Sequence, residues 1–412
     1  MLKPKPDVVV AHLGARLHYA VASLLHQEDY LYQFYTDLFL ADDSLAKTLL
    51  SQLPASWIPE PLKKLRTRTA PIPNSRVTSF QKLGFNYRQE LQKSHKSVTD
   101  IFYDYNRLFG RRVAEHPKFK SANVIYGFTG SALEIFKTAK SEGAACILEQ
   151  MSAPVATGNR VVENEHDKWP NWQPGESTLW DLEKWEPRQQ AEWALADCII
   201  APSRYIASEL KKTGISDSKI ETLPFAVSTD MFPQKTHSFD GQRPLRILYV
   251  GGIRLLKGVP YLLEALTLLP EKQFEAVLVG QNHFADDILS QYDSVMTHYS
   301  HIPRDQLLKW YEWADLFVMP SLCEGSATVN YEARACGLPA GATETSGTWI
   351  EHKQEGLIVP PRDSKEIAAA IQYFLDNPEA IEKMSKQNLK NLDPFRWEAY
   401  KKRLINLIDK LS

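Results

Sequence analysis

Two glutamates, Glu324 and Glu332, stand with seven residues between them in a stretch whose residue types suit a charged ligand. The stretch reads PSLCEGSATVNYEARACGLP over Pro320–Pro339, and a helical pattern begins near Ala327. A helix start offers unpaired backbone N–H groups and the positive end of the helix dipole, which favour a phosphate. A carboxylate before that start can accept hydrogen bonds from ligand hydroxyls, and one about a turn and a half inside the helix can bind a vicinal diol such as a ribose. The spacing therefore predicts a ligand that combines a sugar, a phosphate and a nucleoside.

A second candidate is the glycine-rich turn Gly251–Gly258 (GGIRLLKG), which follows the largely apolar run Arg246–Val250. Glycines let the backbone approach a ligand closely, and Lys257 can place a point charge on a phosphate. The spacing of a P-loop is absent, so the turn does not predict that class of nucleotide site. Together with the glutamate motif, the turn predicts a phosphate-bearing ligand in the second half of the chain.

The elements that must position these residues read as parallel strands and covering helices. Largely apolar runs of three to five residues alternate with longer helical patterns, which is typical of strands buried on both faces. The runs are Val8–Ala11, Asn123–Tyr126, Ala145–Leu148 and Cys198–Ala201 in the first half, and Arg246–Val250, Ala276–Val279, Leu316–Met319 and Leu357–Val359 in the second. We therefore expect two doubly wound α/β domains, whose ligands bind beyond the carboxyl ends of the strands.

The domain limits follow from a polar stretch between the two halves. Phe232–Pro244 (FPQKTHSFDGQRP) has no periodic apolar pattern and contains prolines and a glycine, so it reads as a linker. This places a first domain at residues 1–232 and a second at residues 244–393. The last helical pattern, within residues 394–412, is expected to pack back on the first domain.

Composition and charge exclude several classes of protein. The 412 residues include 48 basic and 50 acidic side chains, so no overall field draws the chain onto nucleic acid. The four cysteines are far apart, which argues against structural zinc or a disulfide framework and fits a reducing compartment. Met1–Pro6 lacks the apolar core of a signal peptide, and no run reaches the ~20 apolar residues of a membrane span. We expect a cytoplasmic protein of several domains.

The motif residues resemble a known enzyme family. Glu324 and Glu332 fit the E-x7-E motif of retaining glycosyltransferases with the GT-B fold, and EGSATVNYEARACGLP resembles the signature of family 4. The resemblance continues through Glu344–Asp363 and begins upstream at Ala194–Phe232, and it is looser in the first half, where VVVAHLGARLHYAVA carries it. It implies a GT-B fold, with two Rossmann-like domains that face each other across a cleft.

The resemblance also implies substrates and roles. A nucleoside-diphosphate sugar would bind in the second domain and give its sugar, with retained configuration, to an acceptor hydroxyl offered by the first. Lys257 would neutralise the diphosphate and Glu324 would bind the donor sugar, so these two are the catalytic candidates. The donor-binding candidates are Gly14, Gly252, Arg254, Lys257, Glu324, Gly325, Ser326, Ala327, Thr328 and Glu332. Neither a metal ion nor a cofactor is expected, because the lysine and the helix start supply the positive charge.

Two positions depart from the family pattern. The family often has an arginine five residues before its lysine, where this chain has Gly252, and Arg254 is the candidate to replace it. Many members also place a histidine after a middle strand of the first domain, where this chain has Tyr126–Gly130 without one. We therefore name no protein base and expect the departing phosphate to take the acceptor's proton. His12 and His18, near Gly14, are interpreted as structural or surface residues.

Two other classes of function stay open at this point. The first is a nucleotide-sugar epimerase or hydrolase on the same fold, because a fold does not fix a reaction. The second is a non-catalytic subunit that binds a nucleotide sugar, and the Gly252 departure is what keeps this alternative open.

Two further segments have a plain interpretation and a functional one. Near Trp57 the sequence has five basic residues, Lys63, Lys64, Arg66, Arg68 and Arg76. The plain interpretation is a solvated basic segment, and the functional one is a weak peripheral contact of residues 63–76 with anionic membrane lipids. Five tryptophans lie among acidic residues, namely Trp169, Trp172, Trp180, Trp185 and Trp193. They either pack between helices or form a platform that stacks on sugars. In both cases we prefer the plain interpretation, and we read Cys323 and Cys336 as core residues.

Overall fold

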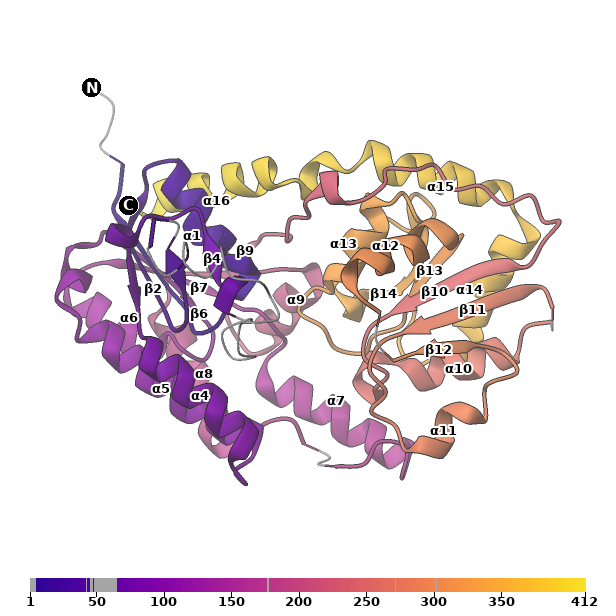
Figure 1. The fold of residues 1–412 in the computed structure, drawn as a ribbon, viewed down its shortest axis with the longest axis horizontal. Coiled ribbons are helices and arrows are strands. Elements are labelled where there is room, and N and C mark those ends of the chain that lie inside the picture. Colours follow the sequence, from indigo (N-terminus) through magenta and orange to yellow (C-terminus); the bar gives the residue numbers. More distant parts are fainter. Residues whose placement is uncertain are drawn as a thin grey trace.

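The computed structural model describes residues 5–41, 43–44, 47, 65–175, 178–270, 272–300 and 302–412. Within them, two parallel sheets lie side by side and helices cover their faces (Figure 1). The first sheet has the order β5-β2-β1-β6-β7-β8-β9 and the second the order β12-β11-β10-β13-β14-β15. Both sheets therefore reverse their strand order once, beside their first strand, as a doubly wound fold does.

The strands of the first half are β1 (Val8–Ala11), β2 (Leu31–Thr36), β3 (Leu40–Ala41), β4 (Thr69–Ala70), β5 (Val77–Ser79), β6 (Val124–Phe128), β7 (Ala145–Glu149), β8 (Cys198–Ala201) and β9 (Ile220–Thr222). Its helices are α1 (Ala20–Gln27), α4 (Gln81–Lys93), α5 (Val98–Ala114), α6 (Leu133–Ser141), α7 (Val155–Lys168), α8 (Leu182–Leu195) and α9 (Arg204–Lys212). Strands β3 and β4 pair with each other outside the main sheet.

The strands of the second half are β10 (Leu245–Val250), β11 (Phe274–Val279), β12 (Thr297–Tyr299), β13 (Leu316–Met319), β14 (Ala340–Thr343) and β15 (Gly356–Val359). Its helices are α10 (Val259–Thr267), α11 (Asp286–Ser290), α12 (Arg304–Trp313), α13 (Thr328–Ala335), α14 (Ser364–Asp376) and α15 (Glu379–Lys390), and α16 (Trp397–Leu411) ends the chain. β10 pairs with β13, so the loops after these two strands are neighbours.

The central strands are buried on both faces, as their apolar sequences predict. Every residue of β1, β8 and β13 is buried, because helices cover each sheet from both sides. A single cluster of buried apolar side chains continues from β1 of the first domain to β15 of the second. The predicted fold, two Rossmann-like domains built on parallel sheets, is confirmed.

Loops at the carboxyl ends of both sheets contact each other. The Ser203 hydroxyl, just after β8, donates to the Gly325 carbonyl at 2.6 Å, just after β13. Helix α7 reaches from the first domain toward the second (Figure 1), and its Glu165 carboxylate accepts a hydrogen bond from the Tyr261 hydroxyl at 2.7 Å. The Arg362 guanidinium donates to the same buried carboxylate at 2.5 Å. The ends of the strands, where ligands bind in such sheets, therefore face the partner domain.

The last helix crosses back to the first domain, as predicted. Helix α16 buries Leu404 and Ile408 against the apolar face around Val10 of β1. The Tyr30 hydroxyl also donates to Asp409 of α16 at 3.0 Å. In Figure 1, α15 and α16 run along one side of both domains and join them.

The expected linker, Phe232–Pro244, contains neither helix nor strand. It is nevertheless held against the second domain, because the backbone N–H of buried His237 donates to the Ser385 hydroxyl at 2.8 Å. The domain limits at residues 232 and 244 stay a prediction.

Candidate active site

The two predicted ligand-binding loops meet where the second sheet reverses its strand order. The Lys257 ammonium, after β10, forms an ion pair with the Glu324 carboxylate, after β13. Gly258 makes this contact possible, because its φ of 67° is in the left-handed region and a Cβ there would overlap the Pro320 carbonyl oxygen. A glycine is therefore required where α10 begins against the neighbouring loop.

The ion pair is largely shielded from solvent. The Lys257 side chain is 24% exposed and that of Glu324 is 18% exposed. Burial, and the nearby Arg254 guanidinium, lower the pKa of Lys257, while the carboxylate that it contacts favours the charged ammonium. Each partner thus neutralises the other in this structure.

Arg254 lies beside Gly252, the position at which the family pattern often has an arginine. Its side chain folds over Gly252, so that a Cβ built at position 252 would lie 3.4 Å from the Arg254 Nε. The guanidinium is exposed and donates to the His283 Nε2 at 2.9 Å. A second cationic group is therefore present beside Lys257, although it is carried by a different residue.

At the start of α13 one predicted N–H group already has an acceptor. The Ala327 N–H donates to the Ser346 carbonyl at 3.1 Å, and its role toward a phosphate stays a prediction. The Ser326 hydroxyl is also engaged, with the Gly347 carbonyl at 2.9 Å. By contrast, the backbone N–H groups of Ser326 and Thr328 donate to no acceptor in the described part of the chain.

Gly325 and Glu332 have separate structural settings. A Cβ on Gly325 would overlap the carbonyl oxygen of Met151 in the first domain, so this glycine lets the two domains touch. Glu332 is half-buried on α13, and its carboxylate accepts a hydrogen bond from the Tyr311 hydroxyl at 2.9 Å. That hydroxyl orients the carboxylate.

Gly14 lies in the first domain, in the loop after β1. Its N–H donates to the buried Asp37 carboxylate at 3.0 Å, and its carbonyl accepts from the His12 Nδ1 at 2.8 Å. Burial lowers the pKa of His12 to about 3, so this histidine stays neutral and positions the loop. The cavity beside Gly14 is lined by first-domain residues, so the structure does not bring Gly14 into one cavity with the glutamates. No sequence pattern pointed to Asp37.

A buried carboxyl that the sequence did not reveal lies at the end of β7. Glu149 is fully buried and accepts a hydrogen bond from the Tyr126 hydroxyl at 2.6 Å. Its second oxygen, Oε1, has no hydrogen-bond partner among the described residues. Burial raises the pKa of Glu149 to about 7.

The raised pKa predicts a pH-dependent gain from Glu149→Gln. The folded protein holds this proton between about pH 4.5 and 7, whereas the unfolded chain has released it, so Glu149 lowers stability as the pH rises through that window. Glutamine imitates the neutral acid. At pH 8 the free energy of unfolding of the variant is expected to exceed that of wild type by up to ~3 kcal/mol, and this difference should shrink toward pH 5. Urea unfolding at both pH values measures this.

Glu192→Gln is the matched control. Glu192 is also fully buried, and burial raises the pKa of its carboxyl to about 7 as well. This carboxylate, however, accepts backbone N–H bonds from Gly130 at 2.8 Å and Ala132 at 3.0 Å, which Glu149 lacks within the described part of the chain. A glutamine there would direct its side-chain N–H groups toward the backbone N–H donors. This variant should therefore be less stable than wild type at both pH values. Equal effects of the two substitutions at pH 8 would contradict the account of Glu149.

The tryptophans pack between helices and domains. Trp169 lies edge-on to Tyr261 at 5.6 Å between ring centroids, and Trp172 to Phe284 at 5.4 Å, so both contact the second domain. Trp185 and Trp193 are buried. The packing interpretation is the better one.

The four cysteines are free thiols and all are buried, as expected of core residues. In the basic segment, Trp57, Lys63 and Lys64 lie outside the described residues. Arg68 turns inward, with its guanidinium 3.7 Å from the Asp37 carboxylate. No helix in the described ranges combines the length and the apolar character that crossing a membrane requires.

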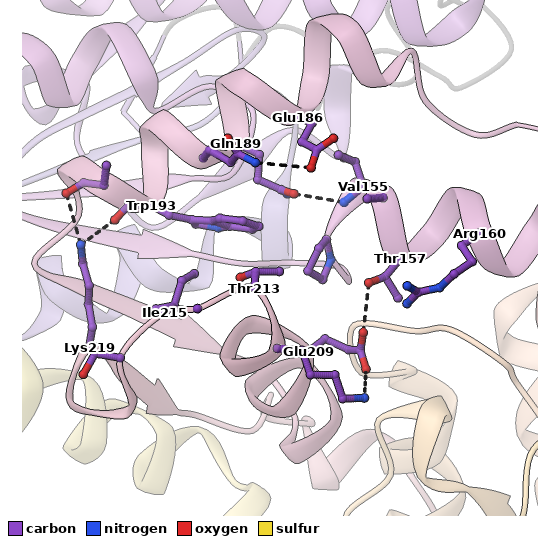
Figure 2. Close-up of a pocket in the computed structure, with 17 residues that line it drawn as sticks. Val155, Thr157, Arg160, Glu186, Gln189, Trp193, Glu209, Thr213, Ile215 and Lys219 are labelled. Atoms are coloured by element: carbon purple, nitrogen blue, oxygen red, sulfur yellow. Dashed lines mark hydrogen bonds and ion pairs between the residues drawn. The ribbon is translucent and has the colours of Figure 1, made fainter.

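A cavity of about 640 Å³ opens between α7, α8 and α9, away from the predicted site (Figure 2). Its polar groups largely bind one another. The Glu209 carboxylate accepts from the Thr157 hydroxyl at 3.0 Å and pairs with Lys212 at 2.6 Å, and the Gln189 side chain accepts from the Val155 N–H at 3.0 Å. None of the predicted site residues lines it.

Comparison with known proteins agrees with the geometry. The family model Glycosyl transferases group 1 matches residues 244–377, which contain Lys257, Glu324 and Glu332. Residues 244–377 are therefore similar to a group 1 glycosyltransferase domain. Both candidate loops, and the ion pair that joins them, lie within this matched segment.

Similar proteins extend the comparison. The D-inositol 3-phosphate glycosyltransferase of Paenarthrobacter aurescens is 29% identical over 187 residues, which are 42% of this chain and 46% of that protein. The chain thus matches about half the length of this curated relative. Sucrose-phosphate synthase from Thermosynechococcus elongatus has a TM-score of 0.65 at 18% identity and covers 99% of both chains. Anabaena Alr3699/HepE in complex with UDP-glucose has a TM-score of 0.61 at 13% identity, over 98% of this chain and 100% of that one. These likenesses show the GT-B fold for the group 1 domain and its partner domain.

Proposed function

We propose that the chain is a cytoplasmic, retaining glycosyltransferase that moves a sugar from a nucleoside-diphosphate sugar to an acceptor hydroxyl. The observation that supports this best is the Lys257–Glu324 ion pair at the carboxyl ends of β10 and β13, inside the group 1 domain. UDP-glucose is bound in a solved structure of the same fold, Anabaena Alr3699/HepE. The E-x7-E spacing supports the family 4 assignment, with retention of configuration.

Donor binding would exchange the partners within the ion pair. The diphosphate would take the place of Glu324 against Lys257, with Arg254 and the N–H groups of Ser326 and Thr328 nearby. The released Glu324 carboxylate would then accept hydrogen bonds from the donor sugar. Glu332 would hold the ribose. The two cations and the helix start would supply the positive charge, so we expect the transfer to proceed without a metal ion.

The chemical step would break the bond between the anomeric carbon and the phosphate oxygen. A bond from the acceptor oxygen to that carbon would form on the same face, and the acceptor's proton would pass to the departing phosphate oxygen. Negative charge grows on the diphosphate as the sugar approaches an oxocarbenium ion. Charges fixed at that position stabilise the transition state more than the ground state.

A ligand screen tests the donor side of this proposal. We expect a diphosphate of uridine, guanosine or adenosine to raise the unfolding temperature of the full chain, with ~2.7 kcal/mol of stabilisation at a hundred times its Kd. The matching nucleoside, which lacks the diphosphate, should give a much smaller shift. If none of the three diphosphates stabilises the protein, the proposed function is wrong.

Product analysis tests the reaction. Proton NMR of the intact donor sugar with enzyme and acceptor should show a new glycoside with the donor's anomeric configuration. An isomerised nucleotide sugar would indicate an epimerase, and free sugar alone would indicate a hydrolase. Binding without any product, across a panel of acceptors, would indicate a non-catalytic subunit.

A further inference from the structure

We propose that the cavity beside Gly14 binds a phosphate ester on the acceptor, an inference that rests on the proposed function. The cavity has a volume of about 900 Å³ and is lined by residues of the first domain between Leu13 and Phe102. Its charged lining residues are all cations, namely Arg16, Arg68, Arg88 and Lys93. A cavity with four cations and no lining carboxylate favours an anion.

Two of these arginines lack a hydrogen-bonded or ion-pair partner within the part of the chain that the structure describes. Arg16 follows the Gly14 loop and Arg88 lies on α4, and neither donates a hydrogen bond or forms an ion pair with any residue that the structure describes. Burial lowers the pKa of both side chains, against smaller attractions of Arg16 to Glu149 and of Arg88 to Asp37. A partly desolvated, unpaired guanidinium is unfavourable, and an anion in the cavity would remove that cost.

The third arginine connects the cavity to the Gly14 loop. The Arg68 guanidinium lies 3.7 Å from the Asp37 carboxylate, and the same carboxylate accepts the Gly14 N–H at 3.0 Å. Asp37 is buried behind the cavity and does not line it, so it orients Arg68 without filling the anion site. The bound phosphate would therefore lie beside the Gly14 loop.

The backbone before α1 fixes the position of Arg16. Leu17, His18 and Tyr19 have φ values of 46°, 50° and 66°, which are unfavourable for residues with a side chain. Tyr19 holds this turn, because its ring is buried and its hydroxyl donates to the Leu38 carbonyl at 3.1 Å. Arg16 is thus carried on a rigid turn at the edge of the cavity.

The cavity of Figure 2 provides the contrast within the same domain. It too has charged residues in its lining, but Glu209 pairs there with Lys212 at 2.6 Å and accepts from Thr157 at 3.0 Å. Glu209 is therefore matched there by Lys212, and the lining combines carboxylates with cations. The cavity beside Gly14 differs because its lining has cations and no carboxylate, and guanidinium forks bind phosphate oxygens in pairs, which favours a phosphate ester as the anion.

Calorimetry on the full chain tests this site with three phosphate probes and their neutral counterparts. The probes are glucose 6-phosphate against glucose, glycerol 3-phosphate against glycerol, and vesicles of phosphatidic acid against phosphatidylcholine. At least one phosphate probe should bind at least tenfold more tightly than its counterpart, and Arg88→Gln should weaken that binding at least tenfold. Arg16→Gln should do the same where the variant folds. Lys82→Gln, an exposed change on α4 outside the cavity, should have no effect.

The probes also separate the two sources of a phosphate. Binding of a soluble ester supports an acceptor such as a sugar phosphate, and binding of phosphatidic acid alone supports a lipid phosphate. Equal binding of the charged and neutral partners, or phosphate binding that Arg88→Gln leaves unchanged, would overturn the proposal.

The donor site is measured separately, by titrating the same variants with nucleoside diphosphates. Arg88→Gln should bind these as wild type does. If no nucleoside diphosphate binds but a phosphate probe still depends on Arg88, the anion site stands and the proposed function fails.

Discussion

Lys257→Ala is expected to lower turnover of the intact donor by on the order of 10²–10³, the loss typical of removing one group that stabilises developing negative charge. Lys257 lies at the end of the glycine turn, next to the start of α10, and its ammonium is only 24% exposed. A charge in that shielded position acts on the diphosphate as it gains charge, so turnover should fall more than donor affinity. Steady-state kinetics at saturating acceptor, with the KM for the donor measured in parallel, separates the two.

Arg254→Ala is the matched comparison, and roughly a tenfold loss is expected. Its guanidinium is exposed and lies over Gly252, so water screens its charge more than that of Lys257. Arg254→Lys should restore only part of the loss, because a point charge does not replace a guanidinium fork. An Arg254→Ala enzyme with unchanged turnover would mean that Lys257 and the helix start bind the diphosphate without it. Unchanged turnover in Lys257→Ala would contradict the proposed mechanism itself.

The sequence identifies the buried strands well, because their burial on both faces leaves a continuous apolar run. β1, β8 and β13 have the predicted limits, Val8–Ala11, Cys198–Ala201 and Leu316–Met319. Other strands lack that signal. β14 has the sequence AGAT, whose small side chains are buried beside strands with larger apolar side chains. β12 is an edge strand with exposed side chains. Edge position and close packing depend on neighbours that one run of residues does not reveal.

The sequence predicts which loops form the candidate site, but it does not predict the contacts that the residues of these loops make. Glycines, a lysine and two glutamates after apolar strands indicate a phosphate site, because each residue type has a physical reason to be there. The competing contacts come from distant parts of the chain: Ser346 takes the Ala327 N–H, and Met151 of the first domain packs on Gly325. The Lys257–Glu324 ion pair likewise forms between two loops that are 67 residues apart in sequence and meet only once β10 and β13 have paired.

That ion pair gives the two glutamates opposite expected effects on the bare nucleoside diphosphate. Glu324→Ala frees Lys257 from its carboxylate partner, so the diphosphate should bind as well as to wild type or more tightly. Turnover of the intact donor should nevertheless fall steeply, because the sugar loses its carboxylate. Calorimetry with the bare diphosphate and kinetics with the donor show whether affinity and rate separate in this way.

Glu332→Ala should instead weaken binding of the bare diphosphate by roughly 10- to 100-fold, since charge-assisted hydrogen bonds contribute about 1.5–3 kcal/mol each and the ribose is present with or without the sugar. Tyr311→Phe is the graded control, because it removes only the hydroxyl that donates to the Glu332 carboxylate at 2.9 Å. It should cost less affinity than Glu332→Ala, by disordering the carboxylate rather than deleting it. Equal losses for Glu324→Ala and Glu332→Ala would show that the glutamates do not divide the sugar and the ribose between them. A Glu332→Ala variant that binds the bare diphosphate as tightly as wild type would show that Glu332 does not bind the ribose.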